Sequence, residues 1–435
     1  MRMSTGRRRY AVGAIAVVAA LALAACGSSK KNGNANGNGT GDTSAPGVTS
    51  NSILLGTTQP LTGPAAPGYS KISAAMTAYF NFANASGGVN GRKIKLLVED
   101  DGYNPATTAV KTRQLVLQDK VFAIVGALGT PTHTAVLDFL KQNKVPDLFV
   151  ASGSRSWNQP SQYPTTFGWQ PDYTIEGKIL GDYVKKNFAG KTVCTFGQGD
   201  DFGTDGAQGV AMTLGSGALK TKQTYTPTNT NVAPQIGALK SAGCQVVVSF
   251  TVPGFTALAL GTAAQLKYQA QWVISSVGSD IPTLTGFLKT ATKPLLQGAV
   301  SDDYLPIPTD SSNSWIKLFQ MINQKYNNNV PFDGNVEYGM ALAYTTLQAL
   351  KAAGKNLNRG DLVAAVEKGG FTGPGLVPFR YSSTDHAGYA GTRVVTVNNG
   401  VASFTGPTYT TDDSNGPLTA YNAAEVQAPS NGLPQ

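Results

Sequence analysis

The sequence predicts an α/β protein of two doubly wound parallel-sheet lobes that are joined by a three-segment hinge. Apolar strand-like segments alternate with amphipathic helix-like segments, which is the order that builds a parallel sheet with helices on both faces. The alternation forms two series, one on each side of Asp172. The globular region begins near Asn51 and runs for about 360 residues, more than one ordinary core accommodates.

The first series begins at Ile53 and ends at Val150. Within this series, the apolar segment 121–126 reads as a buried strand. A Gly87-Gly88 pair ends its first long helix. The expected segments are strand 53–57, helix 72–85, strand 93–99, helix 105–118, strand 121–126, helix 132–142 and strand 145–150.

The second series follows Asp172 and repeats the alternation. It is succeeded by a helix-rich stretch over 314–353 and by a late hairpin of 392–397 with 402–404. The expected segments of the series are helix 175–187 and strands 192–196, 222–225, 246–250 and 271–275.

These segments define the expected domains. Three crossings between the lobes are expected near residues 170–173, 302–305 and 384–389. The boundaries are lobe 1 at 51–171, completed by about 303–384; lobe 2 at 172–302, completed by about 385–410; and a C-terminal tail at 411–435.

The first 25 residues read as a lipoprotein signal peptide. Arg2 and Arg7-Arg8-Arg9 precede an apolar run from Ala11 to Ala25, the pattern of a secretory signal. Leu23-Ala24-Ala25-Cys26 resembles a bacterial lipobox, which implies that Cys26 is lipidated and becomes the mature N-terminus. We therefore expect an extracytoplasmic protein, lipid-anchored to the bacterial cell membrane. An ordinary signal peptide with a chance cysteine is the alternative, and the export route, general or twin-arginine, stays open.

Residues 26–50 read as a flexible linker between the anchor and the folded lobes. They are rich in Gly, Asn and Ser, and Val48 is their only large apolar residue, so they lack the side chains that build a core.

Net charge argues against a nucleic-acid partner. The chain has 34 basic and 25 acidic residues, a formal charge of +9, and four of the arginines lie in the leader, so the mature charge is 30 − 25 = +5. No basic cluster interleaved with aromatic residues occurs.

The chain has two cysteines besides Cys26, which are Cys194 and Cys244. They either form a disulfide or remain two free, buried thiols, and the sequence leaves both alternatives open.

Three polar loops follow strands of lobe 1, at 57–64, 127–133 and 151–157. Open parallel sheets bind ligands beyond the carboxyl ends of their strands, so these loops predict a binding site. In the second loop, the hydroxyls of Thr130 and Thr132 and the N–H groups of a helix start suit a carboxylate. The alternative, in which the threonine only caps its own helix, stays open.

Short motifs occur in a specific order over residues 53–404 and resemble those of type I solute-binding proteins, in particular the leucine/isoleucine/valine-binding family of ABC importers. They are Thr62-Gly63-Pro64, Gly87-Gly88-Val89-Asn90-Gly91-Arg92, Asp100-Asp101 with Pro105, Val125-Gly126 with Gly129-Thr130-Pro131, Val145-Pro146, Gly168-Trp169-Gln170-Pro171, Asp201-Phe202-Gly203 and Asp385-His386 with Gly388-Tyr389.

The resemblance implies a type I periplasmic binding protein fold, a small-molecule ligand captured by hinge closure, and ABC permease subunits as partners. It implies that the loops at Gly129-Thr130 and Ser152-Gly153-Ser154 hold the ligand's carboxylate and ammonium, that Phe202 packs on the ligand and that Tyr69 closes over it. Trp169, Tyr173, Phe202, Phe255 and Tyr304 are candidates for an aromatic cleft, and Ser276 lies where many family members carry an acid.

That last position is a departure from the family pattern. No acid occurs after the strand at 271–275 until Asp280, and burying an ammonium without a counter-charge is costly. An aliphatic or aromatic carboxylate, or an amide, therefore stands beside a branched-chain or hydrophobic amino acid as the expected ligand. An extracytoplasmic sensor or scaffold of the same fold, without transport, is the alternative function.

The remaining chemistry-bearing residues favour no enzyme, cofactor or metal site. His133 and His386 are the only histidines and lie far apart in the sequence, which argues against a histidine-rich zinc site. His133 opens a helix beside the expected pocket, as a ligand contact or as a cap. Glu99-Asp100-Asp101 reads as a solvated turn, and no hydrolase, phosphate-loop or complete dinucleotide motif is present.

Overall fold

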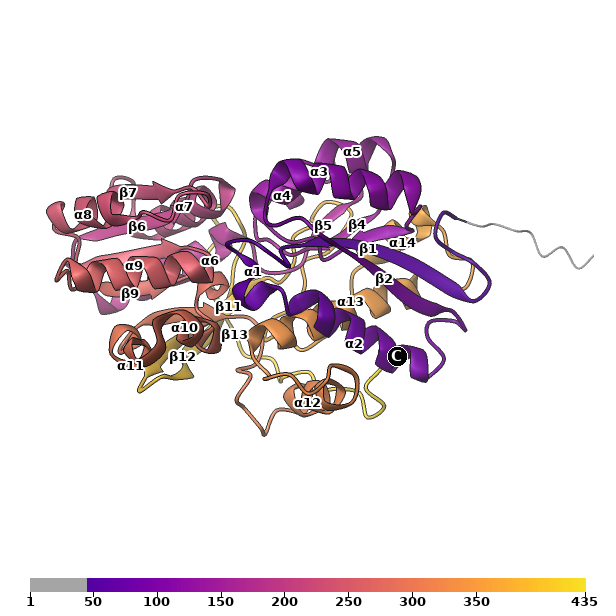
Figure 1. The fold of residues 1–435 in the computed structure, drawn as a ribbon. Helices are drawn as coiled ribbons and strands as arrows, with labels where there is room; N and C mark the ends of the chain where they lie inside the picture. Colours follow the sequence, from indigo (N-terminus) through magenta and orange to yellow (C-terminus); the bar gives the residue numbers. More distant parts are fainter. Residues whose placement is uncertain (1–44) are drawn as a thin grey trace, which may run out of the picture. The chain divides into compact units, whose positions relative to one another are not determined.

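Two α/β lobes, each built on its own sheet, make up the part of the chain that the computed structural model describes, residues 45–435 (Figure 1). This architecture confirms the predicted fold class. The expected signal peptide at 1–25, the lipidation site Cys26 and the linker up to residue 44 lie outside the described residues.

The sheet of lobe 1 has five strands in the order β2-β1-β3-β4-β5, and every pair is parallel. Its residues are buried on both faces where the sequence runs apolar, as at Val121–Val125. Its strands are β1 (Ser52–Gln59), β2 (Lys93–Asp100), β3 (Ala123–Val125), β4 (Asp147–Val150) and β5 (Thr166–Gly168).

The helices of lobe 1 depart from the expected ones in two places. The expected helix 105–118 is α3 (Pro105–Arg113) followed by a π-helical turn at Gln114–Gln118. The expected helix 132–142 is divided into α4 (Thr130–Thr134) and α5 (Leu137–Gln142). The hydroxyls of Thr132 and Thr134 donate to carbonyls four residues earlier, at 2.6 and 2.8 Å, a pattern that bends or ends helices.

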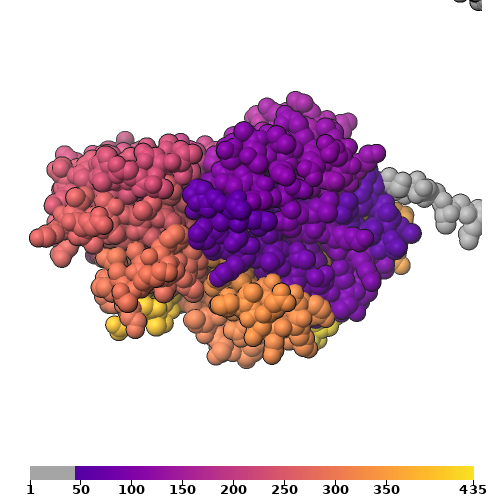
Figure 2. Space-filling view, in the orientation of Figure 1, coloured from indigo at the N-terminus to yellow at the C-terminus, as the bar shows by residue number. Residues whose placement is uncertain are grey.

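Three helices from the far end of the sequence complete lobe 1: α12 (Ser314–Tyr326), α13 (Gly334–Ala352) and α14 (Arg359–Glu367). The ring of Tyr79, on α2 (Ile72–Ala85), packs edge-on against Phe319 of α12 and Tyr344 of α13. In the space-filling view, the orange residues around α12 form a continuous surface with the indigo N-terminal part (Figure 2).

The sheet of lobe 2 has eight strands in the order β13-β12-β11-β10-β9-β8-β6-β7. Strands β7, β6, β8, β9 and β10 run parallel, and the expected hairpin, β11 with β12, extends the sheet antiparallel. Its strands are β6 (Val193–Gln198), β7 (Leu219–Tyr225), β8 (Val246–Phe250), β9 (Gln271–Ile274), β10 (Val300–Asp303), β11 (Gly391–Asn398), β12 (Val401–Thr410) and β13 (Thr419–Tyr421).

Helices α6 (Tyr173–Asn187) and α7 (Asp201–Leu214) cross at very short distance in lobe 2. A Cβ atom at Gly177 would lie 2.3 Å from the carbonyl oxygen of Gly206, so the crossing requires glycine. The other helices of the lobe are α8 (Ala233–Ser241), α9 (Pro253–Gln265), α10 (Ile281–Leu288) and α11 (Thr292–Leu296).

Cys194 and Cys244 form a disulfide, which decides the question that the sequence left open. Cys194 is the second residue of β6, and Cys244 precedes β8 by two residues. The neighbouring strands β6 and β8 bring the two Cα atoms to 5.8 Å, within the range that a disulfide spans.

The chain crosses between the sheets after β5, after β10 and before β11, at the three places expected for the hinge. It then crosses a fourth time beyond β13, because Trp315 Nε1 donates to the Val426 carbonyl at 2.7 Å and Tyr79 Oη to that of Gly432 at 2.6 Å. Only the end of the expected C-terminal tail, 411–435, therefore packs on lobe 1, because its first part forms β13 in the sheet of lobe 2.

The last residues of the expected linker are packed rather than free. Val48 is buried and pairs with Ile53 of β1, and the Gly47 carbonyl accepts the N–H of Leu54 at 2.7 Å. The one large apolar residue of the linker therefore has a place in the core of lobe 1.

Candidate functional site

A cavity of about 450 Å³ lies between the lobes, beyond the carboxyl ends of both parallel sheets. Lobe 1 contributes α1 (Ala66–Tyr69), the loops after β3 and β4, and the start of α13; lobe 2 contributes the loops after β8, β9 and β10. This is the place where open parallel sheets bind ligands. Aromatic side chains form much of its wall: Tyr69, Tyr103, Tyr173, Phe202, Tyr304 and Tyr338.

Half of the ligand-binding residues expected from the sequence line this cavity. They come from α1, the β3 loop, α6, α7 and the turn after β9: Tyr69, Gly129, Tyr173, Phe202 and Ser276. The ring centroids of Tyr173 and Phe202, from the neighbouring helices α6 and α7 of lobe 2, lie 4.4 Å apart.

The loops after β3 and β4 reach the cavity at Gly129 and Ala151, but Thr130 and Ser152 lie behind its wall. Thr130 Oγ1 and Ser152 Oγ are 2.8 Å apart, and each lies within hydrogen-bond distance of Tyr173 Oη, at 3.4 and 3.3 Å. A Cβ atom at Gly153 would lie 2.9 Å from the ring of Tyr173. The tyrosine therefore stands between these hydroxyls and the cavity.

The other expected residues are engaged elsewhere. Ser154 Oγ donates to Asp201 Oδ2 across the lobes at 2.8 Å, and its own backbone turn is capped by the same hydroxyl. Phe255 stacks on Tyr225 with ring centroids 3.9 Å apart, inside lobe 2. Of the aromatic candidates, Tyr304 lines the cavity, whereas Trp169 is buried behind it and donates to Thr345 Oγ1 at 3.0 Å.

Contacts between the lobes surround the cavity. Tyr69 Oη donates to the Val277 carbonyl at 2.9 Å, and Gln198 Nε2 donates to Tyr103 Oη at 3.2 Å. On another side, the Gly334 N–H donates to Asp280 Oδ1 at 3.1 Å. The two lobes are therefore in contact, and a ligand in this cavity would be enclosed by both of them.

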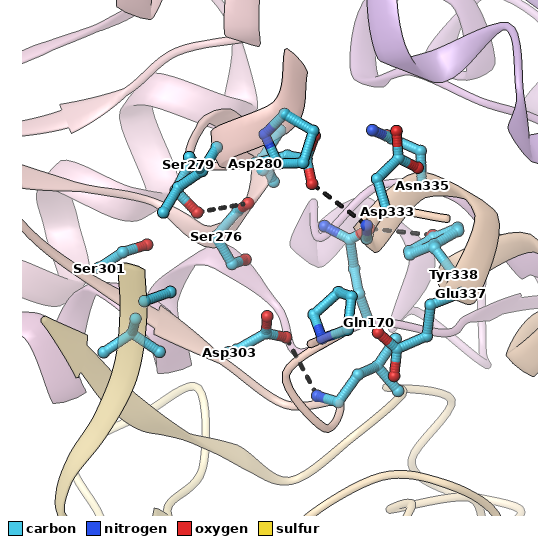
Figure 3. A pocket seen from close by; sticks show the side chains of 18 of the residues that line it. Gln170, Ser276, Ser279, Asp280, Ser301, Asp303, Asp333, Asn335, Glu337 and Tyr338 are labelled. Carbon is cyan, nitrogen blue, oxygen red and sulfur yellow. Dashed lines mark hydrogen bonds between the residues drawn. The ribbon is translucent and has the colours of Figure 1, made fainter. Parts of the chain in front are cut away.

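Carboxylates that the sequence analysis did not assign to the site line the cavity. Asp302 and Asp303 end β10, Asp280 caps α10 and Glu337 lies in the first turn of α13. Figure 3 labels Asp280, Asp303 and Glu337. Burial, and then the neighbouring charges, raise the pKa of Asp303 to about 7 and that of Glu337 well above its usual range.

The position of Ser276, where the family pattern expects an acid, is surrounded by acids from other elements. The Ser276 N–H lies 2.7 Å from Glu176 Oε1, on α6, and 3.2 Å from Asp302 Oδ1. Burial and the nearby Glu176 charge raise the pKa of Asp302 well above its usual range. The structure thus places carboxylates near a position that lacks one in the sequence.

Both histidines serve the packing of lobe 1. His133 Nε2 lies 2.8 Å from Asp147 Oδ2 and is fully buried beside Trp157, away from the cavity lining. His386 Nδ1 lies 2.9 Å from the Thr166 carbonyl, and its ring stacks on Phe167.

The turn at Glu99-Asp100-Asp101, expected to be solvated, includes a buried acid. Asp101 is buried and accepts from Tyr103 N and Thr108 Oγ1, each at 2.9 Å, so it organises the turn after β2. Within residues 45–435, no group of three or more His, Cys, Asp or Glu side chains has the arrangement of a metal site. Over the same residues, no helix is long and apolar enough to cross a membrane.

Two lobes that enclose an aromatic and acidic pocket define a two-lobed ligand-binding protein. The chain belongs to the periplasmic binding protein family, whose model matches residues 52–402. This membership confirms the family resemblance found in the sequence, and a solute-binding rather than an enzymatic role. It also implies a location outside the cytoplasm.

Known proteins resemble the chain at low identity. It is 27% identical over 213 residues to Leu/Ile/Val-binding protein homolog 3 of Brucella melitensis; the match covers 45% of the chain and about half, 53%, of that relative. A branched chain amino acid ABC transporter protein of Thermus thermophilus with bound valine shares the fold, with a TM-score of 0.73, 18% identity and coverage of 84% of this chain and 98% of that one. A fatty acid ABC transporter substrate-binding protein of Thermomonospora curvata has a TM-score of 0.72, 21% identity and coverage of 87% and 98%.

Proposed function

We propose that the protein is the lipid-anchored substrate receptor of an ABC importer, which captures a small solute between its lobes and presents it to permease subunits. The observation that carries the proposal is the cavity of about 450 Å³ with walls from both lobes. Hinge closure brings such walls together on a ligand. The relatives and structural neighbours, which include branched-chain amino acid and fatty acid transport proteins, support the same role.

The ligand class that we propose is a branched-chain or other hydrophobic amino acid, or a related small carboxylate or amide. Aromatic walls from Tyr69, Tyr173, Phe202 and Tyr304 suit an apolar ligand body. Lipidation of Cys26 is part of the proposal and rests on the lipobox-like sequence that precedes it.

The first test is a thermal-shift screen of the purified protein against amino acids, their decarboxylated and deaminated analogues, short amides, fatty acids and sugars. A ligand at 100 times its dissociation constant adds about 2.7 kcal/mol to stability, which is readily detected. Small-angle scattering then measures whether the bound protein is more compact. No stabilisation by any probe, together with unchanged scattering, would argue against a receptor.

Tyr69→Phe tests whether closure contributes to affinity. The variant keeps the ring but loses the hydrogen bond to the Val277 carbonyl across the lobes, which should weaken ligand binding about 5- to 10-fold. Tyr326→Phe is the matched control, because Tyr326 is exposed on α12 and lies outside the cavity lining. Equal affinities of both variants and the unmodified protein would mean that this contact has no part in capture.

Cys26→Ser tests the anchor. The substitution should release the protein from the membrane fraction and abolish incorporation of labelled fatty acid. Retention of the label in the variant would exclude lipidation at this cysteine.

A further inference from the structure

One side of the cavity carries several acids and no base. Asp280, Asp303 and Glu337 all line it, and among the described lining residues none is Lys, Arg or His. The lysine next to this region, Lys71, is ion-paired with Asp333. A ligand that enters this side therefore meets carboxyl groups whose charge the protein does not balance.

Glu337 is the clearest sign that a ligand completes the site. Its side chain is 99% buried and points into the cavity from the first turn of α13 (Figure 3). Its Oε1 atom has no hydrogen-bond partner among the described residues. A buried carboxyl oxygen without a partner costs about 1–3 kcal/mol or more, so such a group marks a place where a donor is expected.

Two tyrosines line the cavity together with these acids. They are Tyr304 and Tyr338, which follow Asp303 and Glu337 in the sequence. The Tyr338 hydroxyl is engaged, since it donates to Gln170 Oε1 at 3.1 Å. Tyrosine rings next to carboxylates attract organic cations through the ring quadrupole as well as through the opposite charge.

The part of the cavity that Tyr173 and Phe202 line offers little to an anion. The hydroxyls of Thr130 and Ser152, from the loops that the family resemblance assigned to the ligand's carboxylate and ammonium, lie within hydrogen-bond distance of each other and of Tyr173 Oη. Tyr173 and Phe202 present aromatic rings to this part of the cavity. An apolar ligand body therefore fits here better than a second charged group does.

We propose that the pocket binds a small organic cation, an alkyl- or arylammonium compound whose charged nitrogen lies between Glu337 and Asp303 and whose apolar body lies against Tyr173 and Phe202. This inference rests on the proposed receptor function and changes its ligand class, because it requires a positively charged nitrogen and no carboxylate on the ligand. It assigns the cation to carboxylates of α13 and β10, not to the turn after β9.

Proton release accompanies such binding. Without a cation, burial and the charges of Asp303 and Asp280 keep the pKa of Glu337 high, and burial and the charges of Asp280 and Glu176 keep that of Asp303 high. The nearby tyrosines, Tyr304, Tyr338 and Tyr389, are neutral between pH 6 and 8 because their pKa values are raised. An ammonium group favours the ionised carboxylates, so its binding should displace protons near pH 7 and tighten as the pH rises from 6 to 8.

The test compares four probes that share a 3-methylbutyl group: leucine, isoamylamine, 4-methylpentanoate and 4-methylpentanamide, with phenethylamine and 3-phenylpropanoate as an aromatic pair. Isothermal titration in two buffers of different ionisation enthalpy gives both affinity and protons released. We expect the amines to bind, with proton release, and the carboxylates without an amine to bind at least about 30-fold more weakly.

Glu337→Gln tests the contact at nearly constant shape. It should weaken amine binding about 30-fold or more, reduce the number of protons released, and leave binding of the neutral amide within about threefold. Glu99→Gln is the matched control, because it removes the same charge at the surface of β2, where Glu99 pairs with Lys111 at 2.8 Å. The control should leave the amine affinity unchanged.

The outcomes separate the two proposals. If carboxylates or amides bind and the amines do not, or if Glu337→Gln binds amines as the unmodified protein does, the cation site is wrong while the receptor function stands. If no probe of any charge binds, both proposals are contradicted. Amine binding that depends on Glu337 and releases protons supports both.

Discussion

The disulfide between Cys194 and Cys244 should contribute about 4 kcal/mol to the stability of the protein. The two cysteines are 50 residues apart in the sequence, and closing a loop of that length in the unfolded chain removes entropy worth about 4 kcal/mol at 25 °C. Reduction of the bond leaves both sulfur atoms buried near β6 and β8, so little packing is lost. The loss of stability on reduction therefore comes mainly from the entropy of the unfolded chain.

Urea unfolding followed by circular dichroism measures the effect, with oxidised protein compared with protein held in a phosphine reductant. The double variant Cys194→Ala/Cys244→Ala should unfold at lower urea still, because each lost sulfur removes roughly 1 kcal/mol of packing. The reductant should not change the double variant, which is the control. Unfolding of the oxidised and reduced proteins within 1 kcal/mol of each other would refute the loop argument, and alkylation of both cysteines without reduction would refute the bond itself.

Two further perturbations follow from buried charges. Because the folded pKa of Asp303 is about 7 and its ordinary value is 3.8, its neutral carboxyl stabilises the fold fully below about pH 4, and this contribution is lost as the pH rises through 7. Asp303→Asn should therefore reduce the difference in Tm between pH 5 and pH 8, and an unchanged difference would contradict this. Lys178→Met should cost about 3 kcal/mol and speed proteolysis at 412–416, because Lys178 Nζ donates to the carbonyls of Asp412, Ser414 and Gly416 at 2.8–2.9 Å. Unchanged urea midpoints and cleavage rates would mean that this lysine does not hold the loop.

Most of the buried strands could be predicted from runs of apolar residues in the sequence, because a strand buried on both faces must be apolar along its length. Strand β8, Val246–Phe250, is such a case and was predicted with its observed bounds. Strands β5 (Thr166–Gly168) and β10 (Val300–Asp303) were missed, since the first has three residues and the second ends in two acids. Their places depend on neighbours in the sheet, not on their own composition.

The site was predictable where it follows from strand ends and not where it depends on distant segments. The loop carrying Gly129 and the aromatic Phe202 were found because carboxyl ends of parallel strands share one edge. Asp303 and Glu337 come from a crossing and from a helix that returns to lobe 1, so no local pattern joins them. The one available sign of Glu337 was that it is the single acid within α13.

The fourth crossing of the chain has a topological consequence. An even number of crossings leaves both ends of residues 45–435 in lobe 1, so lobe 2 is an insert with no free end. Only five residue steps separate Tyr421 of β13 from Val426, whose carbonyl is held by Trp315, so the chain cannot span more than about 18 Å there. The short segment 421–426 therefore limits the separation of the two lobes at this edge of the cleft. Wider opening has to occur by rotation of the lobes about this segment.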